Sequence, residues 1–349
     1  MAAPMGKNEI TLGFVEKAEN WRLSRRFFPS KVGGKPAWLS MKDIPNSDNL
    51  KCRNCGIVCI FLMQVYCPIS ELDTCFHRTV FIFCCRDPAC HTHASNSAFL
   101  VFRSQLPRAN EFYDYEPPDE DSSPGSSLGA ADEGLLCEVC GCFGGKKCAK
   151  CHVKSYCCRE HQLVDWKAGH NKECGSLATG LAATGKEKIL FPEFELVTES
   201  EDYSHEDKDD TGTEECHVAE DRQGLGVEEL EKMALTESKE DRQFAKFKNR
   251  TDYEPDQVIR YQRGGQPLLI STENQPQQKD IPPCTSCGSV RQFEFQVMPQ
   301  LLLHLDVDSL GQSIDWGTLL IYTCAKSCKG VSAYLPEFLW KQDVAVSDE

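Results

Sequence analysis

Apolar and β-prone residues concentrate at the two ends of the chain, in residues 1–110 and 253–342, and polar sequence separates them. Short runs rich in Val, Ile, Phe and Tyr within these ends predict strands at residues 61–66, 80–84, 293–298 and 319–323. Residues 227–250 have helix-forming composition, but Glu237 and Asp241 interrupt the apolar face, so we expect a partly exposed helix there. The pattern predicts an α+β fold that is mostly β.

The polar middle of the chain carries the net charge. The whole chain has a formal charge of -15, and residues 193–241 hold 19 Asp and Glu against 4 Lys and Arg, which is also -15. The remainder is therefore a neutral body. Residues 113–134 are rich in Pro, Ser, Gly and acid, which is typical of a linker. We divide the chain into a first β-rich unit (1–112), an acidic linker (113–134), a cysteine-rich segment (135–176), an acidic and largely disordered segment (177–226), a helix (227–250) and a second β-rich unit (251–349).

The two β-rich units look like copies of one another. The first contains GGKPAWL at 33–39 and CRNCG at 52–56, and the second contains GGQPLLI at 264–270 and CTSCG at 284–288. A Gln-Val pair begins 12 residues after the first cysteine in both units, at Gln64 and Gln296. The shared order predicts an internal duplication. It leaves open whether the two copies pack together.

Each copy offers four cysteine sulfurs, Cys52, Cys55, Cys85 and Cys90 in the first and Cys284, Cys287, Cys324 and Cys328 in the second. The glycine after each Cys-x2-Cys suits the tight turn of a zinc knuckle. Strands running from one knuckle into the other give the layout of a zinc-ribbon-like β-hairpin with one zinc per copy. His91, His93 and Cys84 could each replace Cys90 or Cys85, and buried free cysteines without metal are the alternative.

The densest cysteine segment, residues 137–174, contains four pairs of ligand-type residues. They are Cys137-x2-Cys140, Cys148-x2-Cys151, Cys157-x3-His161 and His170-x3-Cys174. Each spacing lets two donors converge on one ion, and eight tetrahedral positions make two closed, structural zinc sites. A segment this short cannot bury enough apolar surface to fold alone, so zinc would supply its folding energy. Cys142 and Cys158 are surplus thiols, which we expect to be bystanders.

The order of these pairs, with Tyr156, Gln162 and Trp166 around the later ligands, resembles that of MYND fingers. The resemblance implies interleaved sites, with Cys137, Cys140, Cys157 and His161 on one zinc and Cys148, Cys151, His170 and Cys174 on the other. The family more often has cysteine where His161 stands. MYND fingers usually bind short proline-containing peptides, and the resemblance makes Tyr156, Gln162 and Trp166 the candidate peptide-binding residues.

Composition excludes several classes of function. The 21 cysteines, clustered at metal-site spacings, indicate a reducing compartment and not a disulfide framework. We find no secretory leader and no apolar run of the roughly 20 residues that a membrane span requires. Residues 137–174 are close to neutral once zinc and thiolates are counted, so we expect no direct DNA binding. Every clustered Cys and His is explained as a ligand, so we expect no enzyme activity.

Taken together, the paired CxxCG knuckles, FEFQVMPQLL at 293–302, DWGTLLIYTC at 315–324 and the inserted MYND finger resemble the programmed cell death protein 2 family. The resemblance implies a dedicated chaperone that captures a basic small-subunit ribosomal protein and supports its delivery to 40S subunit assembly. Older descriptions of the family imply instead a nuclear MYND-type scaffold that binds co-repressor proteins in transcriptional co-repression or regulates apoptosis. Either role places the chain in the cytoplasm and nucleus, with zinc as its cofactor.

Overall fold

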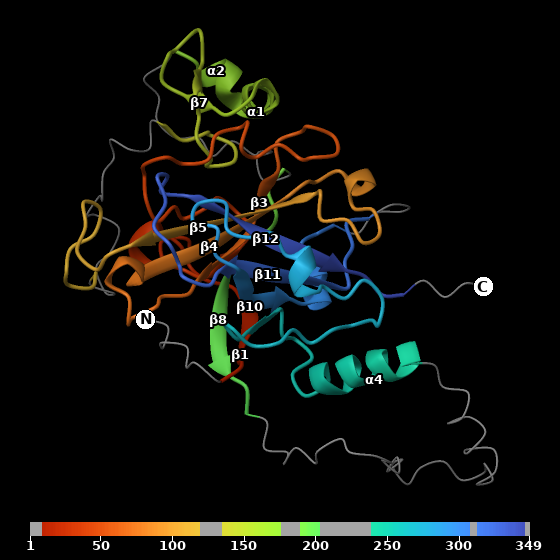
Figure 1. Cartoon of the computed structure of the whole chain (residues 1–349). Coiled ribbons are helices and arrows are strands. Elements are labelled where there is room, and N and C mark those ends of the chain that lie inside the picture. Colours follow the sequence, from red (N-terminus) through yellow and green to blue (C-terminus); the bar gives the residue numbers. More distant parts are fainter. Residues whose placement is uncertain (1–8, 119–134, 176–188, 203–238, 308–312, 346–349) are drawn as a thin grey trace, which may run out of the picture.

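Ten strands form one closed barrel in the computed structural model, which describes residues 9–118, 135–175, 189–202, 239–307 and 313–345 (Figure 1). The first end of the chain supplies β1 (Thr11–Glu16), β2 (Lys31–Val32), β3 (Ile60–Tyr66), β4 (His77–Cys84) and β5 (Phe99–Leu106). The second end supplies β9 (Ile259–Tyr261), β10 (Arg291–Val297), β11 (Thr318–Cys324) and β12 (Leu335–Gln342). The tenth strand, β8 (Phe194–Ser200), comes from between them.

The two ends of the chain pack together as one barrel, which the sequence left open. The strand order is β1-β8-β2-β3-β4-β5-β12-β11-β10-β9, and β9 closes the ring by pairing with β1. The two ends therefore meet at β1–β9 and also at the β5–β12 seam, where only residues 101–103 pair with 335–337. By contrast, β4 and β5 pair along residues 77–84 and 99–106. The barrel is therefore continuous, with a short join between its two halves.

Strand β8 lies inside residues 177–226, the segment that the sequence predicted to be acidic and largely disordered. Its sequence alternates, so that Leu196 lies in the core while Glu199 on the opposite face is exposed. The backbone just before β8 packs directly against the two adjacent glycines of GGKPAWL. A side chain would prevent this contact, because a Cβ on Gly33 would lie 1.8 Å from the carbonyl oxygen of Pro192. The high acid content of the segment hides this strand. The rest of the acidic segment, residues 203–238, lies outside the described residues.

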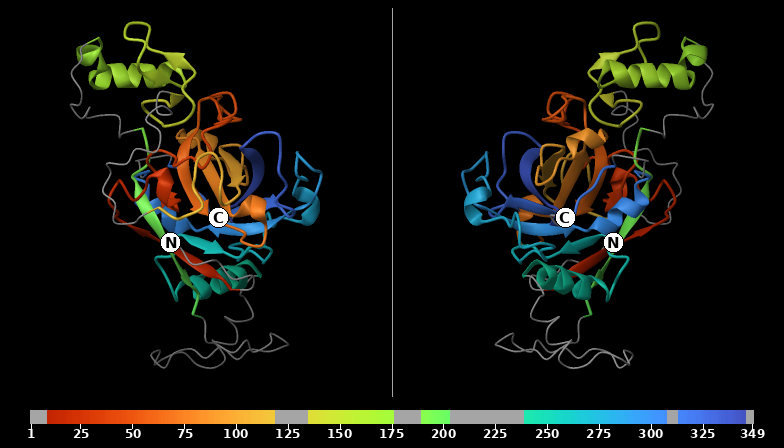
Figure 2. Two further views of the ribbon diagram at one scale, coloured as in Figure 1. Left: turned by 90° about the vertical axis from the view of Figure 1, so that its left-hand side faces the viewer. Right: turned by 90° about the vertical axis from the view of Figure 1, so that its right-hand side faces the viewer.

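Helix α4 (Lys239–Thr251) packs against the barrel on the side away from the cysteine-rich segment (Figures 1 and 2). The sequence predicted a helix at residues 227–250, of which the structure describes the part from residue 239. Phe247 is buried with Ile270 and Met298. Arg250 at the end of the helix donates to Glu201, just after β8, at 2.7 Å. None of the helices in the described ranges is long and apolar enough to cross a membrane.

Buried ion pairs join the two halves inside the barrel. Arg78 of β4 donates from Nη1 and Nη2 to the two carboxylate oxygens of Glu294 on β10, at 2.7 and 2.9 Å. Glu294 stands at a register shift in β10, and such a bulge re-aims a side chain. On β12, Glu337 pairs with both Arg103 and Arg291 at 2.8 Å. Because β4 and β10 are not neighbours in the sheet, the first pair spans the interior.

The repeated motifs have matching surroundings in the two halves. Gln64 accepts a hydrogen bond from the backbone N–H of Ala37 and donates to its carbonyl, at 2.9 and 3.3 Å. Gln296 makes the same two contacts with Leu268, at 2.7 and 3.1 Å. Ala37 and Leu268 occupy the same position in GGKPAWL and GGQPLLI. The duplication itself stays a prediction, but each glutamine clamps the segment that follows its glycine pair.

Candidate metal centres

Among the residues that the structure describes, four groups of four side chains come together as candidate metal centres. They are Cys52, Cys55, Cys85 and Cys90 at the first end; Cys284, Cys287, Cys324 and Cys328 at the second end; and, between them, Cys137, Cys140, Cys157 and His161, and Cys148, Cys151, His170 and Cys174. Within each group every ligand atom lies within 4.8 Å of the others. The last two groups have the interleaved composition that the MYND resemblance implies.

The spacing of the ligand atoms fits zinc. A tetrahedral ion with Zn–S bonds of about 2.3 Å places its sulfurs about 3.8 Å apart. Five pairs of sulfurs are 3.6–3.8 Å apart, namely Cys55–Cys85, Cys140–Cys157, Cys148–Cys174, Cys284–Cys328 and Cys287–Cys324. The histidine nitrogens lie 3.1–3.7 Å from their neighbouring sulfurs. These sets of thiolates with at most one imidazole are the donors of structural zinc sites, although the role of each residue as a ligand stays a prediction.

All four Cys-x2-Cys turns have one geometry. The residue after the second cysteine donates its backbone N–H to the carbonyl of the first cysteine, at 2.9 Å in each turn. That residue has a positive φ in every case, at Gly56, Gly141, His152 and Gly288. Glycine adopts this conformation without strain, which explains three of the four positions. The turn aims both sulfurs at the same point.

One cysteine of each Cys-x2-Cys turn has a thiol that ionises readily. Backbone N–H donation, first from Ser289, lowers the pKa of Cys287 to about 6. Burial opposes ionisation of Cys151, but the N–H groups after it lower its pKa to about 7. The pKa of Cys52 is lowered in the same way, and contact with the Cys140 side chain lowers that of Cys137. Metal binding requires thiolates, so these turns favour the binding form.

The alternatives left open at the first end are separated by the structure. Cys84 is fully buried, and burial raises the pKa of its thiol. His91 directs Nε2 to the carbonyl oxygen of Cys85 at 2.7 Å, and His93 is exposed. Neither histidine belongs to the group of four. The geometry therefore favours Cys85 and Cys90 over these three replacements.

The cysteine-rich segment folds as a small module, with β6 (Lys146–Lys147), β7 (Ser155–Tyr156), α1 (Arg159–Asp165), a π-helical turn (Trp166–His170) and α2 (Asn171–Glu173). Gly169, with φ of 148°, breaks the terminal helix. Tyr156 is fully buried and donates its hydroxyl to Asp165 at 2.6 Å, so it is not available to a peptide as the resemblance implied. Gln162 and Trp166 are half-buried, and their role in peptide binding stays a prediction.

This module contacts the barrel through its Cys137-x2-Cys140 turn (Figure 2). Trp38 donates its indole N–H to the carbonyl of Gly141 at 2.7 Å, and Lys35 donates to the carbonyl of Glu138 at 2.9 Å. A Cβ on Gly141 would lie 2.8 Å from the Cβ of Lys35, so the contact is close. Both barrel residues belong to GGKPAWL. The module is therefore fixed to the first half of the barrel.

Comparison with known proteins identifies the family. The chain is 49% identical to Programmed cell death protein 2 of Bos taurus over 95% of this chain and 96% of that protein. It belongs to the programmed cell death protein 2 family. The family's N-terminal domain matches residues 9–120, its C-terminal domain 241–343, and the MYND finger 137–174, which is called the finger below.

More distant relatives extend the family. Programmed cell death protein 2-like of Homo sapiens is 28% identical over 86% of this chain and 85% of that protein. "Probable 20S rRNA accumulation protein 4" of Schizosaccharomyces pombe is 23% identical over 85% of this chain and 87% of that protein. No solved structure matches the chain. The two family domains are the two halves of one barrel here.

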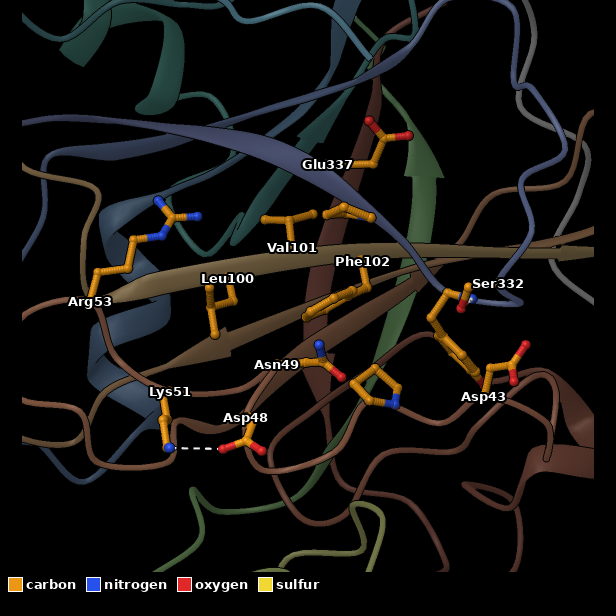
Figure 3. Close-up of a pocket in the computed structure, with 13 residues that line it drawn as sticks. Asp43, Asp48, Asn49, Lys51, Arg53, Leu100, Val101, Phe102, Ser332 and Glu337 are labelled. Atoms are coloured by element: carbon orange, nitrogen blue, oxygen red, sulfur yellow. Dashed lines mark hydrogen bonds and ion pairs between the residues drawn. The ribbon is translucent and has the colours of Figure 1, made fainter. Parts of the chain in front are cut away.

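A groove of about 510 Å³ runs along the seam between these two family domains (Figure 3). Its apolar lining includes Leu100, Phe102 and Tyr334. One wall is the loop 43–53, which leads into the Cys52 knuckle, and the other is the segment 332–337, which follows Cys328. The two end centres therefore anchor both walls. No motif in the sequence marked this groove, because residues far apart in the chain build it.

Charged residues stand at the two ends of the groove. Arg53 and Lys51 lie toward one end, and Asp43 lies toward the other (Figure 3). Lys51 is paired with Asp48 at 2.8 Å, and Glu337 in the lining is held by two buried arginines. The groove thus combines an apolar floor with a polar rim.

Proposed function

We propose that this chain is a non-enzymatic chaperone that captures a basic small-subunit ribosomal protein and supports its delivery to 40S subunit assembly. The observation that carries the proposal is the relationship to a Schizosaccharomyces pombe protein named for the accumulation of 20S rRNA. If the members of this family assemble the small ribosomal subunit, a role of one member in rRNA accumulation is explained. Such a protein would work in the cytoplasm and nucleus.

The charge distribution supports capture of a basic client. Residues 193–241 carry the whole formal charge of -15 on an otherwise neutral chain. A ribosomal protein is basic and binds stray RNA before assembly. An acidic segment raises the rate at which such a client is met, and it competes with RNA for the client's cations.

The groove offers a place for a specific contact. Its floor buries apolar side chains, and Asp43 and Arg53 at its ends can meet a basic side chain and a backbone carbonyl. A cavity of about 510 Å³ holds a few residues of an extended segment. The acidic segment would speed the encounter, and the groove would supply the selectivity.

The experiment is co-expression of the full chain with individual small-subunit ribosomal proteins, scored by the soluble fraction of each client. Residues 203–238 hold 12 Asp and Glu against 3 Lys and Arg, and replacing these acids by Asn and Gln leaves β8 and α4 intact. This variant should bind the client more weakly and with less dependence on salt. If the wild-type chain keeps no ribosomal protein soluble, the proposal is wrong.

A groove variant separates selectivity from charge. Asn49 is exposed on the groove wall, and Asn49→Trp would fill the space without touching the core. Asn249→Trp, at an exposed position on α4, is the matched control. We expect the first substitution to release the client and the second to leave binding unchanged. Equal binding by both variants would remove the groove from the account.

The second candidate is a scaffold that works through the finger, as a MYND finger usually does, and the match of residues 137–174 favours it. Partners would then be proline-containing peptides or co-repressor proteins. Trp166→Ala should cripple such a scaffold and spare the chaperone, whereas replacing Cys284 and Cys287 should do the reverse. We also propose that neither role involves catalysis, because four protein ligands leave a zinc ion no open position for substrate.

A further inference from the structure

A sulfur that is not one of the four ligand-type groups stands beside the first finger centre, which consists of Cys137, Cys140, Cys157 and His161. The Sγ of Cys158 lies 3.7 Å from the Sγ of Cys157, and the Cys158 side chain is buried. That separation equals the edge of about 3.8 Å between two thiolates on one tetrahedral zinc. The sulfurs of Cys157 and Cys158 are therefore as far apart as two thiolates bound to the same zinc ion, although Cys158 is outside the group of four.

Cys158 also lies against the histidine of the centre. It is the N-cap residue of α1, and its sulfur accepts a hydrogen bond from the backbone N–H of His161 at 3.4 Å. The cap turns the Cys158 side chain back over the first helical turn, toward the residue that supplies the only nitrogen ligand. The Cys158 sulfur therefore lies both beside the ligand-type sulfur of Cys157 and against the helical turn that carries His161.

The other surplus thiol is placed differently. The Sγ of Cys142 lies 3.9 Å from the carbonyl oxygen of Cys140, beside the first knuckle and not beside α1. Cys142 is just as buried as the ligands themselves. The chain thus contains a matched internal control, since two spare cysteines flank one centre and only one of them caps the helix that carries His161.

We propose that Cys158 is a fifth metal-binding group of the first finger centre and can take the place of His161 on zinc. In the exchange the Zn–N bond breaks, a Zn–S bond forms, and the thiol proton of Cys158 passes to the released imidazole. No electron is transferred. The centre changes from three thiolates and one histidine, with a net charge of -1, to four thiolates with a net charge of -2.

The test uses the full-length protein and four variants: His161→Ala, Cys158→Ser, His161→Ala/Cys158→Ser and His161→Ala/Cys142→Ser. Serine keeps the N-cap acceptor but is a poor zinc ligand, so the cap is preserved. Native mass spectrometry gives the zinc count, and zinc transfer to a chelator gives the rate of loss. We expect His161→Ala to keep the wild-type count. His161→Ala/Cys158→Ser should hold one zinc fewer or release one at least tenfold faster, and the Cys142 double variant should match His161→Ala.

Equal zinc counts and equal release rates for His161→Ala and His161→Ala/Cys158→Ser would overturn the proposal. A second measurement covers the case in which loss of His161 disturbs the finger. Alkylation of each cysteine is followed by peptide mass spectrometry in the wild type and in His161→Ala. Slower alkylation of Cys158 in the variant supports its recruitment to the ion, and alkylation as fast as in the wild type or faster contradicts it.

Discussion

Replacing Glu294 by glutamine should destabilise the barrel by about 3–5 kcal/mol, because it removes one partner of a buried ion pair. Glu294 and Arg78 are both fully buried and joined by two hydrogen bonds of 2.7 and 2.9 Å. Tyr261 donates a further bond to the carboxylate at 2.7 Å, and Arg263 lies 3.3 Å away. Glutamine keeps the shape but leaves the Arg78 charge without a counter-charge.

A second route gives a similar magnitude. Burial opposes ionisation of Glu294, but the Arg78 charge outweighs it and lowers the pKa from 4.5 to about 2. The lowered pKa means that the folded protein favours the charged form of Glu294 by an amount on the order of 3 kcal/mol. For a domain of this size, 3–5 kcal/mol corresponds to a fall in Tm of roughly 6–20 °C. The loss is a large part of a typical total stability of about 5–15 kcal/mol.

The assay is chemical and thermal unfolding of the zinc-loaded chain, followed by fluorescence. Asp48→Asn is the matched control, since it makes the same carboxylate-to-amide change at an exposed pair with Lys51 and should leave the unfolding free energy nearly unchanged. Replacing both partners, as Arg78→Met/Glu294→Leu, should recover much of the lost stability, because the fully buried Arg78 charge is removed together with its partner and, of the other charged groups, only the partly exposed Arg263 loses a contact. If Glu294→Gln costs no more than Asp48→Asn, the reasoning from burial fails.

Three further predictions concern Glu294, Trp38 and the metal centres. The folded pKa of Glu294 lies below its unfolded value, so its stabilising contribution is present above about pH 4.5 and is lost as the pH falls toward 2. The difference in unfolding free energy between the wild type and Glu294→Gln should therefore shrink over that range. A constant difference would contradict this prediction. Trp38→Phe removes the donor to Gly141 and should speed hydrogen exchange in residues 137–142 without changing that of β4, at a cost of about 1–2 kcal/mol. Native mass spectrometry of the full chain should show four zinc ions, whereas a count of two would restrict zinc to the finger. A chelator should unfold the finger before the barrel, because zinc supplies the finger's folding energy.

Local patterns in the sequence predicted four of the ten barrel strands and proposed the groups of cysteine and histidine. The runs at 61–66, 80–84 and 319–323 are confirmed within β3, β4 and β11, and the run at 293–298 is confirmed in β10 up to Val297. Ligand spacing within two to four residues also carries information that needs no knowledge of the fold. For that reason the sequence could propose the groups that the structure brings together.

Features that depend on distant partners could not be predicted in the same way. Gly33 is required by Pro192, which is far away in the chain and precedes a strand hidden by acidic residues. Glu294 occupies the position, ten residues after the first knuckle cysteine, that holds apolar Leu62 in the other half. Nothing local indicates that this carboxylate turns inward to meet Arg78. The groove is likewise built by segments that meet only when the barrel closes.

Affinity purification of the full-length chain from RNase-treated cytosolic extract, with bound proteins identified by mass spectrometry, tests the central claim most directly. The account predicts one basic small-subunit ribosomal protein at near-stoichiometric amount, retained by Trp166→Ala and lost from Asn49→Trp. Recovery of co-repressor or chromatin proteins without any ribosomal protein would contradict it and would make the finger the working part of the molecule.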